Sequence, residues 1–256
     1  MSPSISTGPA AITVAIDGPS GSGKSSVSRA VASALSLRYL DTGAMFRALT
    51  LWCLHREIDL ADQAAVLAEA MNMPLQIGTD PTDPAVWLGE DRVDEQIRSA
   101  AISAQVSHVA TNRGVRTVLA AQQRQIIDLA RDEVGGIVVE GRDITTVIAP
   151  DAEHRILLSA TEQARLARRG TELAARGEQA AAAAVRDQVV RRDRDDSTVS
   201  QFMTPAAGVH GIDTSSLTFQ ESVGAVLQVV GPAQSEGAAD PTQADAPHTH
   251  AGGESR

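Results

Sequence analysis

A short glycine-rich segment near the start of the chain has the composition of a phosphate-binding loop. Its spacing fits the Walker A pattern G-x-x-x-x-G-K-[ST], and it contains Lys24, the only lysine among 256 residues. Backbone N–H groups of such a loop turn inward around a polyphosphate, the lysine reaches the β and γ phosphates, and Ser25 ligates Mg²⁺. We therefore expect a nucleoside triphosphate and Mg²⁺ to be held by Gly18, Pro19, Ser20, Gly21, Ser22, Gly23, Lys24, Ser25 and Ser26.

The residues on either side of this loop predict a strand before it and a helix after it. Residues 12–16 form a short apolar, β-branched run that is typical of a buried strand. Apolar residues then recur at helical spacing over residues 24–36. Strand, loop and helix follow in the order that a nucleotide-binding loop requires, which argues against a chance glycine-rich turn.

Short apolar runs alternate with helical patterns along the rest of the chain. Because such alternation favours a parallel sheet covered on both faces, the expected fold is a doubly wound α/β P-loop core. Ligands of such sheets bind beyond the carboxyl ends of the strands. The other expected strands are 37–40, 136–140, 154–159 and a weaker one at 209–212. The other expected helices are 43–56, 61–71, 100–110, 113–131, 161–175, 178–194 and 218–230.

Three stretches differ from this alternating pattern. Residues 1–11 are rich in Ser, Pro and Ala and predict a disordered leader, whereas residues 231–256 predict a disordered acidic tail. The P-loop domain is expected between them, over residues 12–230. Within it, prolines and glycines divide residues 72–98 into short runs that fit small strands of an inserted lobe. A lobe of this kind can hold a second substrate against the triphosphate.

The composition argues against several classes of protein. Aromatic residues make up 2% of the chain and the formal net charge is −10, which disfavours binding of single-stranded nucleic acid by base stacking. The single cysteine, Cys53, cannot form an internal disulfide and lies in an apolar stretch typical of a core. No apolar run approaches the ~18 residues of a membrane span. We expect a cytoplasmic monomer without nucleic-acid or membrane partners.

Two further motifs follow the second and third expected strands. They are D-T-G-A-M-F-R at 41–47 and E-G-R-D at 140–143. Both lie at carboxyl ends of strands and therefore face the same crevice as the glycine-rich loop. Arg47 and Arg142 carry planar guanidinium groups suited to a phosphate monoester, and Asp143 can accept a hydrogen bond from an exocyclic amino group.

Four segments together resemble bacterial cytidylate kinase, a P-loop nucleoside monophosphate kinase that phosphorylates CMP and dCMP. The segments are I-D-G-P-S-G-S-G-K-S, D-T-G-A-M-F-R, V-V-E-G-R-D and R-D-x-x-D-S, and the resemblance covers residues 12–230 in order. It implies ATP as the phosphoryl donor. It also implies an NMP-binding lobe at about 72–98 and a helical lid region at about 161–200 that swings over the phosphates.

The resemblance also implies roles for individual acceptor-site residues. The implied substrate-binding residues are Thr42, Arg47, Ser107, Arg116, Arg142 and Asp143. Arg47 and Arg142 would hold the CMP phosphate. Asp143 and Ser107 would lie near the cytosine amino group, and Arg116 near its carbonyl side.

The chemistry of Asp143 suits cytosine better than uracil. Cytosine presents an amino donor at the position where uracil presents a carbonyl. An ionised aspartate accepts from the amino group but faces the uracil carbonyl as an unpaired acceptor, which costs about 1–3 kcal/mol when buried. The alternative is that Asp143 orients an arginine by pairing with Arg142 or Arg47.

Residues 161–196 carry eight arginines, and we expect them to have different roles. By resemblance, Arg192 would contact the phosphates, and Asp196 would contact the acceptor ribose or orient the lid. With Lys24 and Arg142 they form the expected catalytic set, because phosphoryl transfer between polyanions depends on charge neutralisation and alignment. Solvated helices with Arg/Asp pairs are expected for Arg165, Arg176 and Arg186.

The chain departs from the family pattern at three positions. Val199 occupies the place of a lid arginine, Thr145 the place of a glycine, and Phe46 a place where tyrosine is common. Loss of a transition-state arginine can lower turnover by several orders of magnitude. Arg191 or Arg194 can take over that role through a shift of register.

These observations together predict an ATP-dependent kinase that transfers the γ-phosphoryl group in line to CMP and dCMP, yielding CDP and dCDP. No general base is needed, since the acceptor oxygen is ionised at neutral pH. Asp17 and Asp41 lie near the metal by topology. The alternatives are a kinase for another small acceptor, such as UMP or shikimate, and a nucleotide-binding protein with weakened catalysis and a regulatory role.

Overall fold

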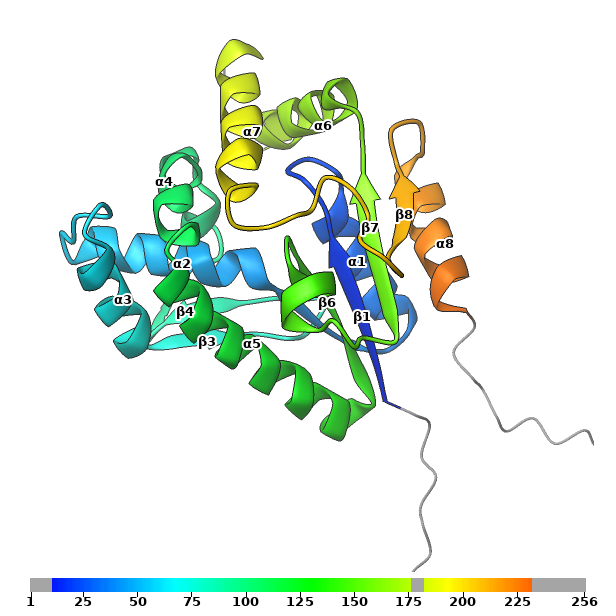
Figure 1. Cartoon of the computed structure of the whole chain (residues 1–256), viewed down its shortest axis with the longest axis horizontal. Helices are drawn as coiled ribbons and strands as arrows, with labels where there is room; N and C mark the ends of the chain where they lie inside the picture. Colours follow the sequence, from blue (N-terminus) through cyan, green and yellow to red (C-terminus); the bar gives the residue numbers. More distant parts are fainter. Residues whose placement is uncertain (1–10, 176–181, 232–256) are drawn as a thin grey trace, which may run out of the picture.

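The computed structural model describes residues 11–175 and 182–231, and its core is one parallel sheet with helices on both sides (Figure 1). The sheet contains β1 (Ile12–Asp17), β2 (Arg38–Asp41), β6 (Gly136–Gly141), β7 (His154–Ser159) and β8 (His210–Asp213). Their order across the sheet is β2-β6-β1-β7-β8, and every neighbouring pair is parallel. The predicted doubly wound α/β fold is confirmed.

Alternation along the central strands creates two separate apolar cores. Val14 and Ile16 of β1 face one core, whereas Ala15 between them faces the other, because successive side chains of a strand point to opposite faces. The first core is completed by α1 (Lys24–Ala34) and α8 (Phe219–Val230). The second is completed by α2 (Thr42–His55) and α5 (Arg113–Val134). Both faces of the sheet are therefore buried, as the near-continuous apolar strands predicted.

Local signals explain where several helices begin and end. α8 follows a capping box in which Thr218 and Glu221 satisfy each other's backbone N–H groups. α5 begins after Asn112, whose side chain accepts from two backbone N–H groups, and ends at Gly135 with a φ of 83°. Among the described residues, no helix combines the length and the apolar character that a membrane-spanning helix needs.

The chain between α2 and α5 forms an insertion beside the sheet. It contains α3 (Gln63–Asn72), three short antiparallel strands, a turn of 3₁₀ helix at Gln96–Arg98, and α4 (Ala100–Ala110). The strands are β3 (Leu75–Ile77), β4 (Val86–Leu88) and β5 (Asp91–Arg92), at the positions where the sequence predicted small strands. The Tyr39 N–H group at the edge of the main sheet donates to the Thr79 carbonyl at 2.8 Å, which ties the insertion to β2.

Two helices project beyond the carboxyl ends of β1 and β7 (Figure 1). They are α6 (Glu162–Ala175) and α7 (Ala182–Asp196), which pack on each other. The sequence did not predict the short π-helical turn Ile144–Ile148 that follows β6. Residues 1–10, Arg176 and most of the predicted tail (residues 232–256) lie outside the described residues.

Candidate active site

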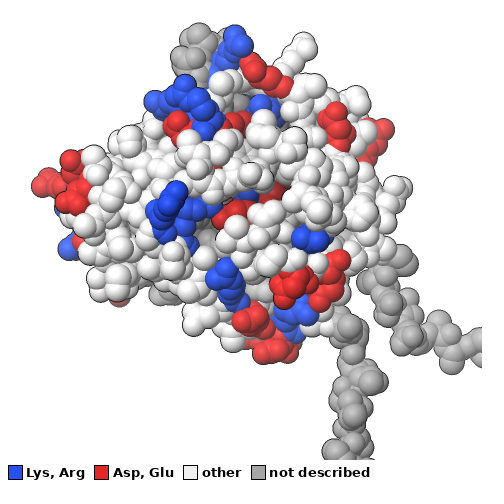
Figure 2. Space-filling view, in the orientation of Figure 1, with Lys and Arg blue, Asp and Glu red and all other residues white. Residues whose placement is uncertain are grey.

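A cleft lies at the carboxyl ends of β1, β2 and β6, with about 1020 Å³ of empty space when the open solvent at its mouth is included. Figure 2 shows a hollow near the middle of one face, with acidic and basic side chains both visible around it. The side chains that line the cleft include seven basic and four acidic groups, although the whole chain is acidic. They are Lys24, Arg47, Arg98, Arg116, Arg142, Arg169, Arg192, Asp41, Glu140, Asp143 and Asp196.

The glycine-rich loop joins β1 to α1 at one side of this cleft. Gly21 and Gly23 have φ angles of 78° and 88°, a conformation that side chains with a Cβ rarely adopt. Gly23 is the N-cap of α1, so the loop ends at the positive end of a helix dipole. Lys24 and Ser25 line the cleft, and Ser26 lies in an adjoining hollow beside α8. The loop therefore has the form of an anion-binding site.

The basic side chains in the cleft lie close enough to oppose one another's charge. Desolvation and the charge of Arg142 lower the pKa of Lys24 to about 8. Desolvation and Arg142 also lower the pKa of Arg192 to about 10, and desolvation with Arg192 lowers the pKa of Arg47. A polyanion in the cleft would relieve this repulsion. The electrostatics thus favour a ligand with several phosphate groups.

Glu140 is a buried carboxylate beside the loop that the sequence did not single out. It is the only acidic residue of β6. Its carboxylate accepts hydrogen bonds from Ser25 Oγ at 3.0 Å and from the Tyr39 hydroxyl. Burial and the nearby Asp41 raise its pKa, although Lys24 opposes the shift. The signal available in the sequence was an acidic residue at the carboxyl end of an apolar strand, the edge of the sheet where ligands bind.

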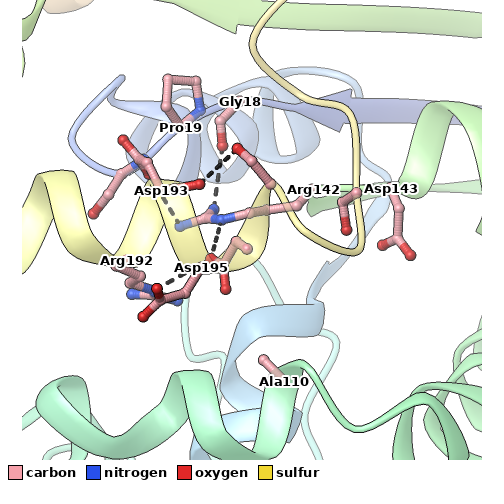
Figure 3. Close-up of polar contacts among 12 residues, drawn as sticks. Gly18, Pro19, Ala110, Arg142, Asp143, Arg192, Asp193 and Asp195 are labelled. Atoms are coloured by element: carbon pink, nitrogen blue, oxygen red, sulfur yellow. Dashed lines mark hydrogen bonds and ion pairs between the residues drawn. The ribbon is translucent and has the colours of Figure 1, made fainter.

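Arg142 connects the glycine-rich loop with α7. Its Nε donates to Asp196 Oδ2 at 2.5 Å, and its Nη1 donates to the Gly18 carbonyl at 3.2 Å. In Figure 3, the Arg142 side chain points toward Gly18 and Asp193, while Asp143 points away from this group. Although burial opposes ionisation, Arg142 and Arg192 lower the pKa of Asp196. In this structure Asp196 forms ion pairs with Arg142 and Arg192, and its role toward the acceptor ribose or the lid stays a prediction.

Asp143 and Arg116 lie together at the other end of the cleft. Arg116 Nη2 donates to Asp143 Oδ2 and also to Ser200 Oγ at 2.8 Å. Asp143 therefore pairs with an arginine, but that arginine is neither Arg142 nor Arg47, the two that the alternative interpretation named. Two of the three side chains that were expected to contact the base are thus brought into contact with each other.

The remaining predicted acceptor residues take different positions. Arg47 donates from Nη1 to the Ile97 carbonyl at 3.0 Å and to Ser103 Oγ at 2.8 Å, and it lines the cleft. Thr42 also lines the cleft, and its hydroxyl donates to the Glu140 carbonyl at 2.8 Å. Ser107 is half-buried on α4 but is not among the residues that line the cleft.

The similarity of this chain to known proteins shows its family. Residues 14–231 match the family model described as cytidylate kinase. The chain belongs to the cytidylate kinase family. A cytidylate kinase of Cutibacterium acnes is 46% identical over 227 residues, covering 88% of this chain and 98% of that protein. Cytidylate kinases of Rhodococcus opacus and Nocardia farcinica are each 45% identical and cover 86% and 89% of this chain, and 94% and 97% of their own lengths.

Solved structures that match the chain are more distant. A shikimate kinase from Bacteroides thetaiotaomicron aligns with a TM-score of 0.42 and 11% identity, covering 86% of this chain and 99% of that one. A likeness at this level does not bear on the chemistry of the cleft. The family assignment rests on the sequence relatives and on the family model.

Two aspartates that topology placed near the metal have other partners. Asp17 is fully buried and accepts from the Ile144 and Thr145 N–H groups, each at 2.9 Å, and from Thr145 Oγ1 at 2.6 Å. Asp17 therefore holds the turn after β6, and it is not among the residues that line the cleft. Thr145, which departs from the family pattern, supplies two of these three hydrogen bonds, one of them from its hydroxyl. Asp41 caps α2 through the Ala44 N–H group and pairs with Arg98 at 3.2 Å, although it also lines the cleft.

The arginines of residues 161–196 agree with the predictions only in part. Arg165 is buried and forms an ion pair with Asp193, so the prediction of a solvated arginine was wrong. The physical reason is that its face of α6 packs on the glycine-rich loop. Arg186 is exposed and pairs with Glu162, as expected.

The two arginines considered as replacements for the lid arginine lie outside the cleft. Arg191 donates to the Ala104 carbonyl at 3.2 Å, and Arg194 is exposed beside Asp195. Val199, Arg191 and Arg194 are not among the residues that line the cleft.

Proposed function

We propose that this member of the cytidylate kinase family transfers the γ-phosphoryl group of ATP to CMP and dCMP, yielding CDP and dCDP. One observation carries the proposal. A single cleft joins a P-loop at one side to the Arg116–Asp143 pair at the other. The curated relatives named cytidylate kinase support the same acceptor. A regulatory protein with weakened catalysis is therefore not favoured.

The donor half of the cleft is suited to ATP with a magnesium ion. The N–H groups that precede α1, together with Lys24, would hold the β and γ phosphates. Ser25 and Glu140 are oxygen donors whose side chains already lie 3.0 Å apart beside Lys24, and hard oxygen ligands suit Mg²⁺. When bound, the ion would neutralise charge on the donor phosphates. Ser25 would ligate it directly, and Glu140 would order water around it.

The acceptor half is suited to a nucleoside monophosphate that carries cytosine. Arg47 and Arg142 would hold its phosphate, and both guanidinium groups are already oriented by protein oxygens. Asp143 would accept from the cytosine amino group, with Arg116 and Ser107 near the base. UMP would leave Asp143 facing a carbonyl oxygen, so CMP should be the better acceptor.

The reaction needs alignment and charge neutralisation more than it needs proton transfer. The acceptor phosphate oxygen is ionised at neutral pH and can attack in line without a general base. Arg142 and Arg192 would stabilise the charge on the transferring group, and Asp196 holds both of them in place. The proposal also includes residues 72–98 as the NMP-binding lobe, residues 161–200 as the lid, and a monomeric cytoplasmic enzyme.

The proposal is tested by measuring ADP release with ATP and Mg²⁺ against CMP, dCMP, UMP, AMP and shikimate. We expect CMP and dCMP to give the highest kcat/KM, with UMP at least tenfold lower on the basis of the Asp143 mismatch. Lys24→Ala should lower turnover by two to three orders of magnitude, which corresponds to about 3–4 kcal/mol. Preference for another acceptor would contradict the assigned substrate. ATP binding without any transfer would contradict the assigned reaction.

A further inference from the structure

Both main-chain groups of Ser20 are held by side chains from α6 and α7. The Ser20 N–H group donates to Asp193 Oδ1 at 3.0 Å. The Ser20 carbonyl accepts from Arg165 Nη1 at 3.1 Å, and the same guanidinium donates to Asp193 Oδ2. The two peptide groups that flank the Ser20 Cα are therefore held by an arginine from one helix and an aspartate from the next.

This pair is buried, which distinguishes it from an ordinary surface ion pair. Arg165 is 6% exposed and Asp193 is 5% exposed. The loop itself packs directly on α6, since a Cβ atom at Gly21 would lie 2.8 Å from the Arg165 carbonyl oxygen and 3.1 Å from its Cβ. A buried charged group that loses its partner strongly destabilises the folded protein. The pair therefore fixes the loop and the two helices relative to each other.

Simple stabilisation of the helical hairpin does not require these contacts. Glu162 of α6 and Arg186 of α7 already form an ion pair at 2.9 Å, at a place where both side chains are exposed. That pair touches no part of the loop in the described contacts. Arg168, one turn along α6 from Arg165, also donates to a loop carbonyl, that of Ser22, at 3.2 Å. The buried face of α6 is thus directed at the loop rather than at α7 alone.

We infer that Arg165 and Asp193 are positioning residues that hold the backbone of Ser20 so that the following N–H groups face the phosphates of the donor nucleotide. Fixing the two peptide groups on either side of Ser20 reduces the conformational freedom that the loop would otherwise lose when ATP binds. The pair has one contact with the acceptor half of the cleft, since Asp193 lies 3.9 Å from Arg142. Loss of the pair should therefore weaken the binding of ATP more than the binding of the acceptor. This inference rests on the proposed function for the identity of the donor.

The test compares Arg165→Met with Arg186→Met, a matched control that removes an arginine from the exposed pair of the same hairpin. ATP affinity is measured by calorimetry with Mg²⁺ and no acceptor, and KM is measured separately for ATP and CMP. We expect Arg165→Met to weaken ATP binding about tenfold or more and to raise KM for ATP more than KM for CMP. Arg165→Lys should recover part of the loss. Arg186→Met should leave ATP affinity unchanged.

Three results would overturn the inference. They are unchanged ATP affinity in a folded Arg165→Met protein, an equal rise of both KM values, and an equal loss of ATP affinity in Arg186→Met. Should Arg165→Met fail to fold, Asp193→Asn provides the same comparison, because it keeps the shape of the side chain and removes its charge. Failure of the parent protein to phosphorylate CMP would count against the proposed function, whereas ATP affinity tests the positioning pair without reference to any acceptor.

Discussion

Because the pKa of Lys24 is lowered, measuring proton uptake when ATP binds tests whether the basic side chains in the cleft repel one another. With a pKa of about 8, the free enzyme holds this ammonium about 90% protonated at pH 7 and about 10% protonated at pH 9. Bound phosphates would return the pKa toward its usual value of 10.5 or above. ATP binding should therefore take up about 0.9 proton at pH 9 and about 0.1 proton at pH 7.

The uptake can be measured by titrating ATP with Mg²⁺ into the protein by calorimetry, in two buffers that differ in ionisation enthalpy. The difference between the two observed enthalpies gives the number of protons exchanged. Lys24→Arg is the control, because a guanidinium keeps its positive charge and holds its proton more strongly than an ammonium does. That variant should bind ATP more weakly and take up at most about 0.1 proton at pH 9, the share that Arg192 can contribute with its pKa of about 10.

The same shift fixes the sign of a stability effect in the ligand-free protein. Unfolded Lys24 binds more protons than folded Lys24 between pH 8 and about pH 10.5, so its contribution to the free energy of unfolding rises across that window. Equal proton uptake at pH 7 and pH 9 would refute the reasoning from repulsion between the basic side chains. Uptake that persists in Lys24→Arg would show that another group titrates.

Three other substitutions test separate parts of the cleft. Asp143→Asn should narrow the ratio of kcat/KM for CMP over UMP by about tenfold, chiefly by weakening CMP, whereas equal losses would mean that Asp143 only orients Arg116. Thr145→Val should lower the free energy of unfolding in urea by about 1–3 kcal/mol, because buried Asp17 loses a donor, and unchanged stability would contradict this. Val199→Arg should raise turnover without changing ATP affinity, since a closing lid acts mainly near the transition state. Unchanged turnover in this variant would contradict the idea that the lid lacks a phosphate contact at position 199.

The sheet and its helices could be predicted because buried positions recur in the sequence as apolar residues at the spacing of a strand or a helix. Strand 154–159 and helix 100–110 were placed with the bounds that the structure has, and the other elements differ by a few residues at their ends. The two-sided burial of β1 and β6 required near-continuous apolar runs, which few loops contain. The π-helical turn at Ile144–Ile148 left no such pattern, because it depends on Asp17, more than 120 residues earlier.

The cleft could be predicted only where a motif carries its own geometry. Lys24 and Ser25 follow a glycine pattern whose spacing determines their position, and Arg47 and Arg142 follow strands that end at one edge of the sheet. Arg165 was misassigned because helical spacing shows that it shares a face with Arg168, but not that this face packs on the loop. That information lies in how α6 is placed against the loop between β1 and α1, which no local pattern records.

The position of Val199 now has a clearer physical meaning. Neither neighbouring arginine lines the cleft in this structure, since Arg191 donates to the Ala104 carbonyl of α4 and Arg194 is exposed. The cleft nevertheless keeps seven basic against four acidic side chains, so the total charge available to a polyphosphate does not depend on position 199. What a lid arginine adds is a donor placed on the transferring group, which matters for turnover rather than for affinity. A gain confined to kcat in Val199→Arg would therefore locate the deficit in alignment, not in charge.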